Sequence, residues 1–198
     1  MTTTQEFLKY LVDNDVEHSV LTHGPALSAH EIAQATHIPE RFVVQTKLMK
    51  IDGYCWMIVL SADRNINHQA VSRALHAKNI KEGLENDWSF FFPNCHTSTI
   101  PPFGNLYGFR VLADASLQEG KRIVFSACSS TQSVFMRWED YAHLVQPLIG
   151  EISQVLPMSE TQRKQQDIAP FPRSSDHAFF SQRQFELDGF FQNLWKKS

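Results

Sequence analysis

The hydrophobic positions of the chain change their period several times, and each change predicts a different element. Residues 3–6 have the Thr-x-x-Glu spacing of a capping box, and the apolar positions that follow recur with helical spacing, which predicts a helix over about 4–14. Residues 16–20 alternate between apolar and polar, as a half-buried strand does, and the His-Gly-Pro sequence at 23–25 ends that strand. A second capping box at 28–31 predicts another short helix.

A β-hairpin is predicted next, because residues 42–51 and 54–60 are β-prone and are separated by the two-residue turn signal Asp52-Gly53. Lys47 lies in the first of these strands. Side chains alternate along a strand, so two sets of residues point to opposite faces: Lys47 with Val43, Gln45, Met49 and Ile51, and on the other side Phe42, Val44, Thr46 and Leu48. Lys47 is therefore a cation on a mainly apolar face, where it either serves a site or discourages edge-to-edge aggregation.

The rest of the first 150 residues mixes helices with strands. Asn67 is a suitable cap for a helix, and a further helix is predicted over 85–92, before Pro93. Residues 93–108 are rich in proline, glycine and small polar residues, which predicts an ordered loop. The remaining elements are strands at 109–113, 122–127 and 132–136 and a helix at 138–146. This interspersion favours an α+β fold over a doubly wound parallel sheet.

The pattern divides the chain into a domain at 1–150 and an appendage at 151–198. Residues 157–175 have the composition of a linker. The aromatic-rich end that follows is predicted to be helical, and we expect it to pack on its own domain or on a second subunit as a homodimer. A helix on a membrane surface is less favoured, because the segment lacks a run of basic residues.

Composition and charge narrow the classes of function. The net charge of −3 excludes a protein that binds nucleic acid over its whole surface, so any contact with RNA must be local. Cations do group locally, at Lys47 with Lys50, at Lys78 with Lys81 and at Lys121 with Arg122. The N-terminus lacks the features of a signal peptide, and no apolar run is long enough to span a membrane, so we expect a cytoplasmic protein.

The three cysteines Cys55, Cys95 and Cys128 are odd in number and form no Cys-x-x-Cys pair. This argues against a disulfide framework or a structural zinc site and favours buried or incidental thiols. His23, His30 and His37 are spaced by sevens, yet they fall on a turn, on a helix and at its end, so we expect neither a metal nor another cofactor.

Several motifs occur in one order over residues 5–147. They are His23-Gly24-Pro25, the Ser28-capped helix, Gln45-Thr46-Lys47-Leu48, the Asp52-Gly53 hairpin, Phe92-Pro93-Asn94-Cys95, Ile100-Pro101-Pro102-Phe103-Gly104, Leu106-Tyr107-Gly108, Val111-Leu112-Ala113-Asp114 and the closing segment 136–144. This order resembles the YbaK-like editing domains, which include domains associated with prolyl-tRNA synthetase. The resemblance implies a mixed, largely antiparallel curved sheet wrapped by helices.

The resemblance also implies an activity: hydrolysis of the ester of a mischarged tRNA that carries a small amino acid such as alanine, cysteine or serine. The partner would be the 3′ end of the tRNA, with an aminoacyl-tRNA synthetase as a further partner. The catalytic positions of the family fall on Lys47, Ser98 and Thr99. The substrate-binding positions fall on His23, Thr46, Ile100, Pro101, Pro102, Phe103, Gly104 and Cys128.

Two positions depart from the family pattern, because Ser98 and Cys128 stand where glycine is usual. The alternative is therefore a catalytically degenerate domain that binds tRNA or a protein without turnover, and a third is a fold that docks to another chain through its aromatic tail. An activated ester needs no nucleophile triad, and the sequence offers none. His96 is a weaker candidate for a general base, and Cys95 and Cys128 are poor candidates for a nucleophile.

Overall fold

The computed structural model describes residues 4–83, 88–93 and 95–156 of the 198-residue chain. Its helices are α1 (Thr4–Asp13), α2 (Ala29–Thr36), α3 (His68–Leu75) and α5 (Trp138–Val145). Short 3-10 turns are η1 (Glu40–Phe42), η2 (Thr97–Thr99), η3 (Gly104–Tyr107) and η4 (Ala115–Gln118). The predicted aromatic tail lies outside the described residues. No helix in the described part is both long and apolar enough to cross a membrane.

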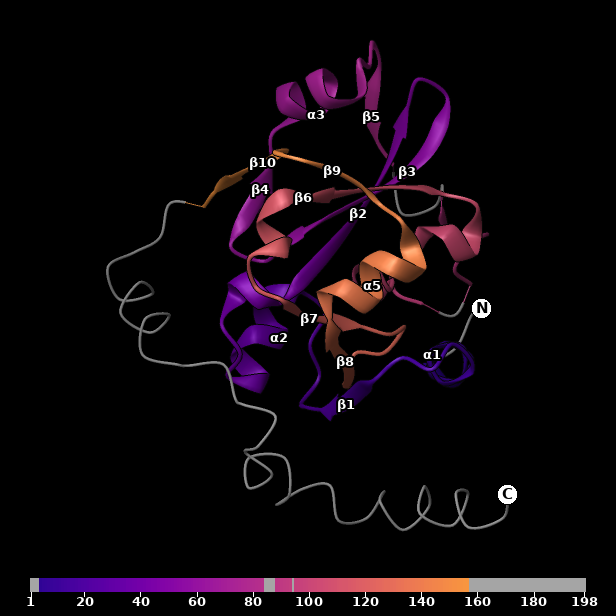
Figure 1. Cartoon of the computed structure of the whole chain (residues 1–198), viewed down its shortest axis with the longest axis vertical. Helices are drawn as coiled ribbons and strands as arrows, with labels where there is room; N and C mark the ends of the chain where they lie inside the picture. The colour runs from indigo at the N-terminus through magenta and orange to yellow at the C-terminus, as the bar shows by residue number, and fades with distance from the viewer. Residues whose placement is uncertain (1–3, 84–87, 94, 157–198) are drawn as a thin grey trace.

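The strands form three sheets (Figure 1). The largest has the order β5-β2-β3-β6-β9 and consists of β5 (Ile80–Glu82), β2 (Val44–Ile51), β3 (Tyr54–Ser61), β6 (Arg110–Asp114) and β9 (Leu148–Gly150). The second has the order β1-β8-β7 and consists of β1 (His18–Thr22), β8 (Gln132–Arg137) and β7 (Arg122–Ser126). The third pairs β4 (Arg64–Ile66) with β10 (Ser153–Val155). Only the pairs β3–β6 and β6–β9 among these ladders are parallel.

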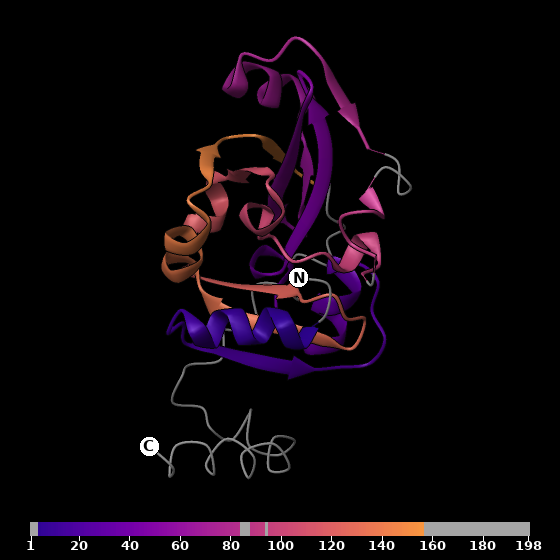
Figure 2. The same ribbon diagram turned by 90° about the vertical axis from the view of Figure 1, so that its right-hand side faces the viewer.

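These observations confirm the α+β class and correct its arrangement, since the strands were expected in one sheet. A parallel bridge between Val43, just before β2, and Val124 in β7 connects the large sheet to the second sheet. Figure 2 shows the β2–β3 hairpin rising away from the three-stranded sheet, with α3 and β5 at its far end. The hairpin therefore has one end beside the other sheet and one end in a projecting tip.

Local signals account for the elements that were predicted correctly. Ser28 Oγ accepts a hydrogen bond of 3.2 Å from the backbone N–H of Glu31 at the start of α2. Asn67 Oδ1 accepts a bond of 3.1 Å from the N–H of Ala70 and caps α3. In the hairpin turn Asp52 and Gly53 both have positive φ, 47° and 86°, as a two-residue turn between antiparallel strands requires. The first capping box includes Thr3, which lies outside the described residues.

Two predictions were wrong or incomplete. A helix was expected over 85–92, but residues 89–91 form turns and are not helical. Residues 84–87 lie outside the described part. The short strands β4, β5, β9 and β10 were not predicted. The last of them pairs residues 153–155 with β4, which precedes α3 in the chain.

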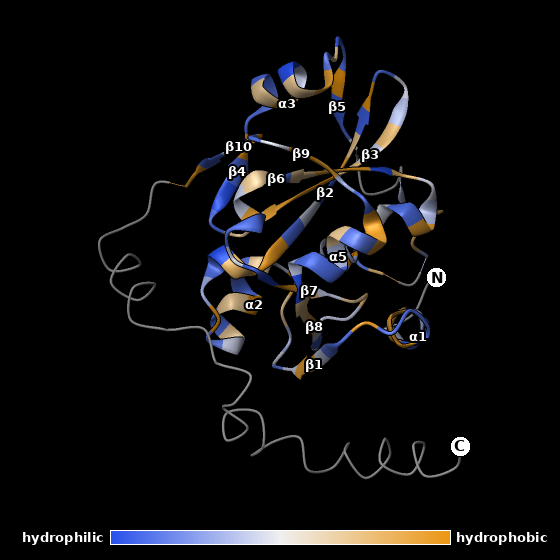
Figure 3. Cartoon of the chain, in the orientation of Figure 1, coloured by the Kyte–Doolittle hydropathy of each residue, from blue (hydrophilic) through white to orange (hydrophobic). Residues whose placement is uncertain are grey.

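The two faces of the large sheet pack into different clusters. One face, with Leu48 and Met57, joins α1, α5 and the second sheet in the main core. The other face, with Met49 and Ile58, packs under α3. α5 turns a hydrophilic surface outward, and its buried residues face the main core (Figure 3). The hairpin strand that carries Lys47 is thus fixed by apolar packing on both faces.

Candidate functional site

Four segments that are distant in sequence meet at one end of the hairpin. Strand β2 lies against the turn η2. Cys128, just after β7, donates a backbone hydrogen bond of 2.8 Å to the carbonyl oxygen of Thr99 in η2. The same loop accepts bonds from the segment after β1, where the N–H of His23 lies 3.0 Å from Thr131 O and that of Ala26 lies 2.7 Å from Ser130 O. The structure therefore brings the strand β2, the turn η2, His23 and Cys128 together.

Lys47 is an exposed cation on β2, one of these four segments. It lies directly opposite Ile58 in the hairpin and on the same face as the buried Met49 and Ile51, as the alternation predicted. Strand β5 pairs with β2 only at residues 49–51, so Lys47 lies beyond the point where this neighbour ends. Within the described part of the chain, the side chain of Lys47 forms no hydrogen bond or ion pair. Its ammonium group is available to an anionic or carbonyl ligand.

The turn η2 combines one exposed hydroxyl with one buried residue. Ser98 is exposed, and its Oγ lies 2.7 Å from Nδ1 of His96, which also accepts a bond of 3.3 Å from the Ser98 N–H. Because Nδ1 accepts from a backbone N–H, we assign the neutral tautomer, in which the Ser98 hydroxyl donates to the ring. Thr99 is 2 % exposed, and its N–H and hydroxyl both donate to His96 O, at 2.8 and 2.9 Å. Thr99 therefore shapes the turn and Ser98 faces outward.

The proline segment from Ile100 to Gly104 is buried. The ring of Phe103 packs edge-on against Phe7, with centroids 4.9 Å apart, in the main core. The hydroxyl of Tyr141 donates a 2.9 Å bond to Pro102 O, and burial raises the pKa of Tyr141. These contacts give Ile100, Pro101, Pro102, Phe103 and Gly104 a packing role, whereas His96 and Ser98 before them are exposed.

Gly104 shows how close this packing is. A Cβ atom at this position would lie 2.8 Å from Cγ2 of Val111, 3.1 Å from Cβ of Phe109 and 3.3 Å from Cβ of Met57. Such distances are shorter than ordinary van der Waals contact. Only glycine allows the proline segment to lie this close to β6 and β3.

The expectation of free thiols is wrong for two of the three cysteines. Cys95 and Cys128 form a disulfide, with their Cα atoms 4.6 Å apart, and Cys55 is free. Cys128 has a φ of 57°, in the left-handed region that glycine adopts most readily. The bridge therefore ties Cys95, two residues before η2, to the position where the family pattern has glycine.

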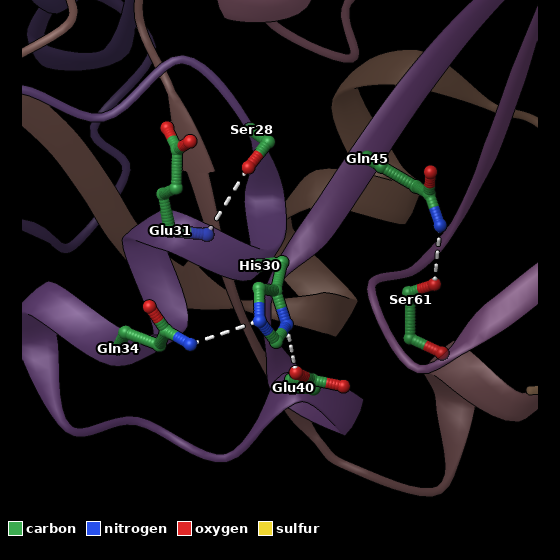
Figure 4. A network of polar contacts seen from close by, with 7 residues as sticks. All are labelled: Ser28, His30, Glu31, Gln34, Glu40, Gln45 and Ser61. Carbon is green, nitrogen blue, oxygen red and sulfur yellow. Dashed lines mark hydrogen bonds and ion pairs between the residues drawn. The ribbon is translucent and has the colours of Figure 1, made fainter. Parts of the chain in front are cut away.

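The three histidines spaced by sevens make separate contacts. His23 is buried, with Nδ1 2.7 Å from Gly24 O and Nε2 2.9 Å from Ser133 Oγ, so we assign Nδ1 as the protonated nitrogen. His30 contacts Glu40 and Gln34 (Figure 4). His37 follows α2 with a φ of 57°. The described residues contain no group of three or more histidine, cysteine or acidic side chains that could hold a metal ion.

Thr46 and its neighbour Gln45 make different contacts. Thr46 is half-buried and pairs with Val59 across the hairpin. Gln45 Nε2 donates to Ser61 O at 2.9 Å, as Figure 4 shows, and to Arg64 O at 2.8 Å. These bonds fix the part of β2 that precedes Lys47. The predicted site residues thus fall into two groups: His23, Thr46, Lys47, Ser98 and Cys128 around the junction of the four segments, and Thr99 with the proline segment beneath it.

The fold and this junction define an α+β protein in which a lysine on a hairpin strand lies beside a turn that leads into a buried proline segment. A model of the aminoacyl-tRNA editing domain matches residues 23–144, and the chain belongs to that family. No curated protein matches the chain.

Solved structures share the fold at low sequence identity. The crystal structure of hypothetical protein APE2540 is 12 % identical, with a TM-score of 0.68 over 75 % of this chain and 99 % of that one. A structure described as "a putative trans-editing enzyme for prolyl tRNA synthetase" is 9 % identical, with a TM-score of 0.66 over 78 % and 99 %. A protein of Marinobacter aquaeolei VT8, described as a signal transduction protein, is 10 % identical with a TM-score of 0.59, over 74 % of this chain and 30 % of that one.

Proposed function

We propose that this protein is an aminoacyl-tRNA deacylase that acts in trans on a tRNA charged with the wrong, small amino acid. The observation that carries the proposal is the exposed ammonium group of Lys47, which has no partner among the described residues and lies on β2, the strand that contacts η2. Membership of the editing-domain family supports the same substrate class. The ligand is the 3′ end of the tRNA.

The reaction is the hydrolysis of an ester. A water oxygen bonds to the carbonyl carbon, the bond from that carbon to the ribose oxygen breaks, and the ribose oxygen leaves with a proton. Lys47 holds the terminal phosphate or the ester carbonyl by a charge-assisted hydrogen bond, which fixes the orientation of the ester. Ser98 accepts a hydrogen bond from the attacking water. His96, which already accepts from the Ser98 hydroxyl, takes up the proton that the water loses and then gives it to the leaving ribose oxygen.

The disulfide favours a second candidate function. Cys128 stands where the family pattern has glycine, and it is covalently bound to Cys95. Ser98 also stands where the family pattern has glycine, so it adds a side chain there. Both changes reduce the room for backbone N–H groups to approach an oxyanion. On this second view the domain binds the aminoacylated end of tRNA without turnover.

A panel of tRNAs mischarged with alanine, cysteine or serine separates the two functions. If the protein is a deacylase, it hydrolyses the ester of at least one of these tRNAs faster than buffer alone does. The Lys47→Ala variant should then hydrolyse that ester no faster than buffer. Lys9→Ala is the matched control, because Lys9 is an exposed lysine that pairs with Asp13 in α1. Binding of the charged tRNA without any acceleration on the panel would exclude the deacylase and support the binding domain.

A further inference from the structure

The far end of the β2–β3 hairpin carries two lysines that the fold places face to face. In the antiparallel β2–β5 ladder, Lys50 is directly opposite Lys81. Side chains at such positions are close neighbours, and like charges there are destabilising. Both residues are exposed, and within the described part of the chain neither has an acidic partner. The chain thus keeps an unfavourable pair of cations on a projecting surface.

A third lysine is held beside this pair by the hairpin turn. The carboxylate of Asp52 accepts bonds from the backbone N–H groups of Lys78, at 3.1 and 3.2 Å, and of Asn79, at 2.8 Å. These backbone bonds lower the pKa of Asp52. The Asp52 carboxylate thus accepts hydrogen bonds from the main chain, and the exposed Lys78 side chain lies next to the turn. We call Lys50, Lys78 and Lys81 the basic tip.

The charge of this region contrasts with that of the whole protein. Residues 64–82, which include α3 and β5, carry four cations, Arg64, Arg73, Lys78 and Lys81, against one acid, Glu82, whereas the whole chain has a net charge of −3. Glu82 is paired with His68, 3.3 Å away. α3, β5 and the end of the hairpin lie together at the top of the molecule (Figures 1 and 2). This projection therefore carries the cations Lys50, Arg73, Lys78 and Lys81 against the acids Asp52 and Glu82.

One exposed aromatic ring lies beside the hairpin turn, on the face opposite to Lys50 and Lys81. Tyr54, beside the hairpin turn, is 56 % exposed and lies under the guanidinium group of Arg110, 4.0 Å from the ring centroid. Cations together with exposed aromatic rings are typical of surfaces that bind a nucleic-acid backbone and stack on its bases.

The distance between the tip and Lys47 suits a ligand that is long enough to reach both. Lys47 and Lys50 are three residues apart on one strand, which corresponds to about 10 Å at the rise of a β-strand. The two side chains leave opposite faces, so a ligand that reaches both passes around the edge of the sheet. An RNA whose 3′ end is held at Lys47 has further phosphates within that distance.

We propose that the basic tip binds the phosphate backbone of the acceptor end of tRNA, and that it holds the substrate while the ester lies at Lys47. This rests on the proposed function for the identity of the ligand. The tip contributes affinity and takes no part in the chemistry.

The test compares the wild type with the double variant Lys50→Gln/Lys81→Gln and with the control Lys9→Gln. Binding of fluorescein-labelled uncharged tRNA is measured from 50 to 200 mM salt, together with kcat and KM for a mischarged tRNA. A minimal substrate, the aminoacyl ester of adenosine, lacks the phosphates that the tip would contact. Melting temperatures verify folding, and the double variant should melt at the same temperature as the wild type or higher, because a repulsion is removed.

The double variant should lower the slope of log affinity against log salt by about 1.5, since each lost phosphate contact removes about 0.7 to 0.9. KM for the tRNA should rise about tenfold with kcat unchanged, and hydrolysis of the adenosine ester should not change. An unchanged salt slope and an unchanged KM in a folded double variant would contradict the proposal that the basic tip binds tRNA. A failure of the wild type to bind tRNA would contradict it as well. If the double variant instead lost affinity for polyglutamate alone, the tip would be a surface for an acidic protein, and the RNA assignment would be wrong.

These measurements test ester hydrolysis and tRNA binding by the basic tip separately. A wild type that binds tRNA with a salt slope dependent on the two lysines, but hydrolyses neither substrate, would contradict the deacylase and support the tip. A wild type that hydrolyses both substrates with a KM independent of the two lysines would support the deacylase and contradict the tip.

Discussion

Removing the Cys95–Cys128 bridge should destabilise the protein by an amount that follows from the length of the loop it closes. The two cysteines are 33 residues apart in sequence. A cross-link over a loop of this length lowers the entropy of the unfolded chain by an amount that corresponds to ~4 kcal/mol at 25 °C. Because the bridge joins the segment before η2 to the loop after β7, its loss should also loosen the junction that positions Ser98.

Urea unfolding with and without dithiothreitol measures this directly. Reduction should lower the unfolding free energy of the wild type by about 4 kcal/mol, while Cys95→Ser/Cys128→Ser should already be destabilised and insensitive to the reductant. Cys55→Ser is the matched control, because Cys55 is free and should leave the effect of the reductant in place. If thiol titration shows three free thiols after reduction and the urea midpoint has not moved, the reasoning is refuted.

Three further changes test the packing around the site. Gly104→Ala should cost about 1 to 3 kcal/mol of unfolding free energy, because the new methyl group overpacks the core, whereas Gly24→Ala meets no atom within 4 Å and should be nearly neutral; equal urea midpoints would contradict this. Tyr141→Phe leaves Pro102 O without its donor and should cost about 1 to 3 kcal/mol in the same assay, and a neutral result would show that the bond contributes nothing. Asp114 is buried, which alone would raise its pKa, but hydrogen bonds from serine hydroxyls and backbone N–H groups lower the pKa below its ordinary value. Its contribution to stability is therefore present above the ordinary pKa of 3.8 and is lost as the pH falls through the lower, folded value, so Asp114→Asn should weaken the acid dependence of the urea midpoint.

Elements with a local signal could be predicted from the sequence. Ser28 and Asn67 predict the helices that they cap. Asp52-Gly53 predicts the hairpin turn, and the alternation from that turn gives the face on which Lys47 lies. The short strands β4 and β10 have three residues each and pair across almost 90 positions, so no periodicity within either one identifies them. Their existence depends on tertiary packing, which a local pattern does not contain.

The candidate site divides in the same way. The alternation of β2 was sufficient to place Lys47, and the resemblance to a family was sufficient to name Ser98. The disulfide was missed because an odd cysteine count and the lack of a Cys-x-x-Cys pair say nothing about which residues approach in space. The burial of Phe103 was missed because two prolines and a glycine have the composition of a surface loop, yet the aromatic ring between them belongs to the core.

The deacylase is tested most directly by the single-turnover rate of ester loss from the mischarged tRNA that the panel identifies, with enzyme in excess. We predict that the wild type and Lys9→Ala hydrolyse the ester at equal rates, well above the spontaneous rate, and that Lys47→Ala is slower by about 100-fold, as expected for the loss of one well-placed electrostatic contact. A Lys47→Ala rate equal to that of the wild type, or a wild-type rate equal to the spontaneous one, would contradict the site proposed around Lys47.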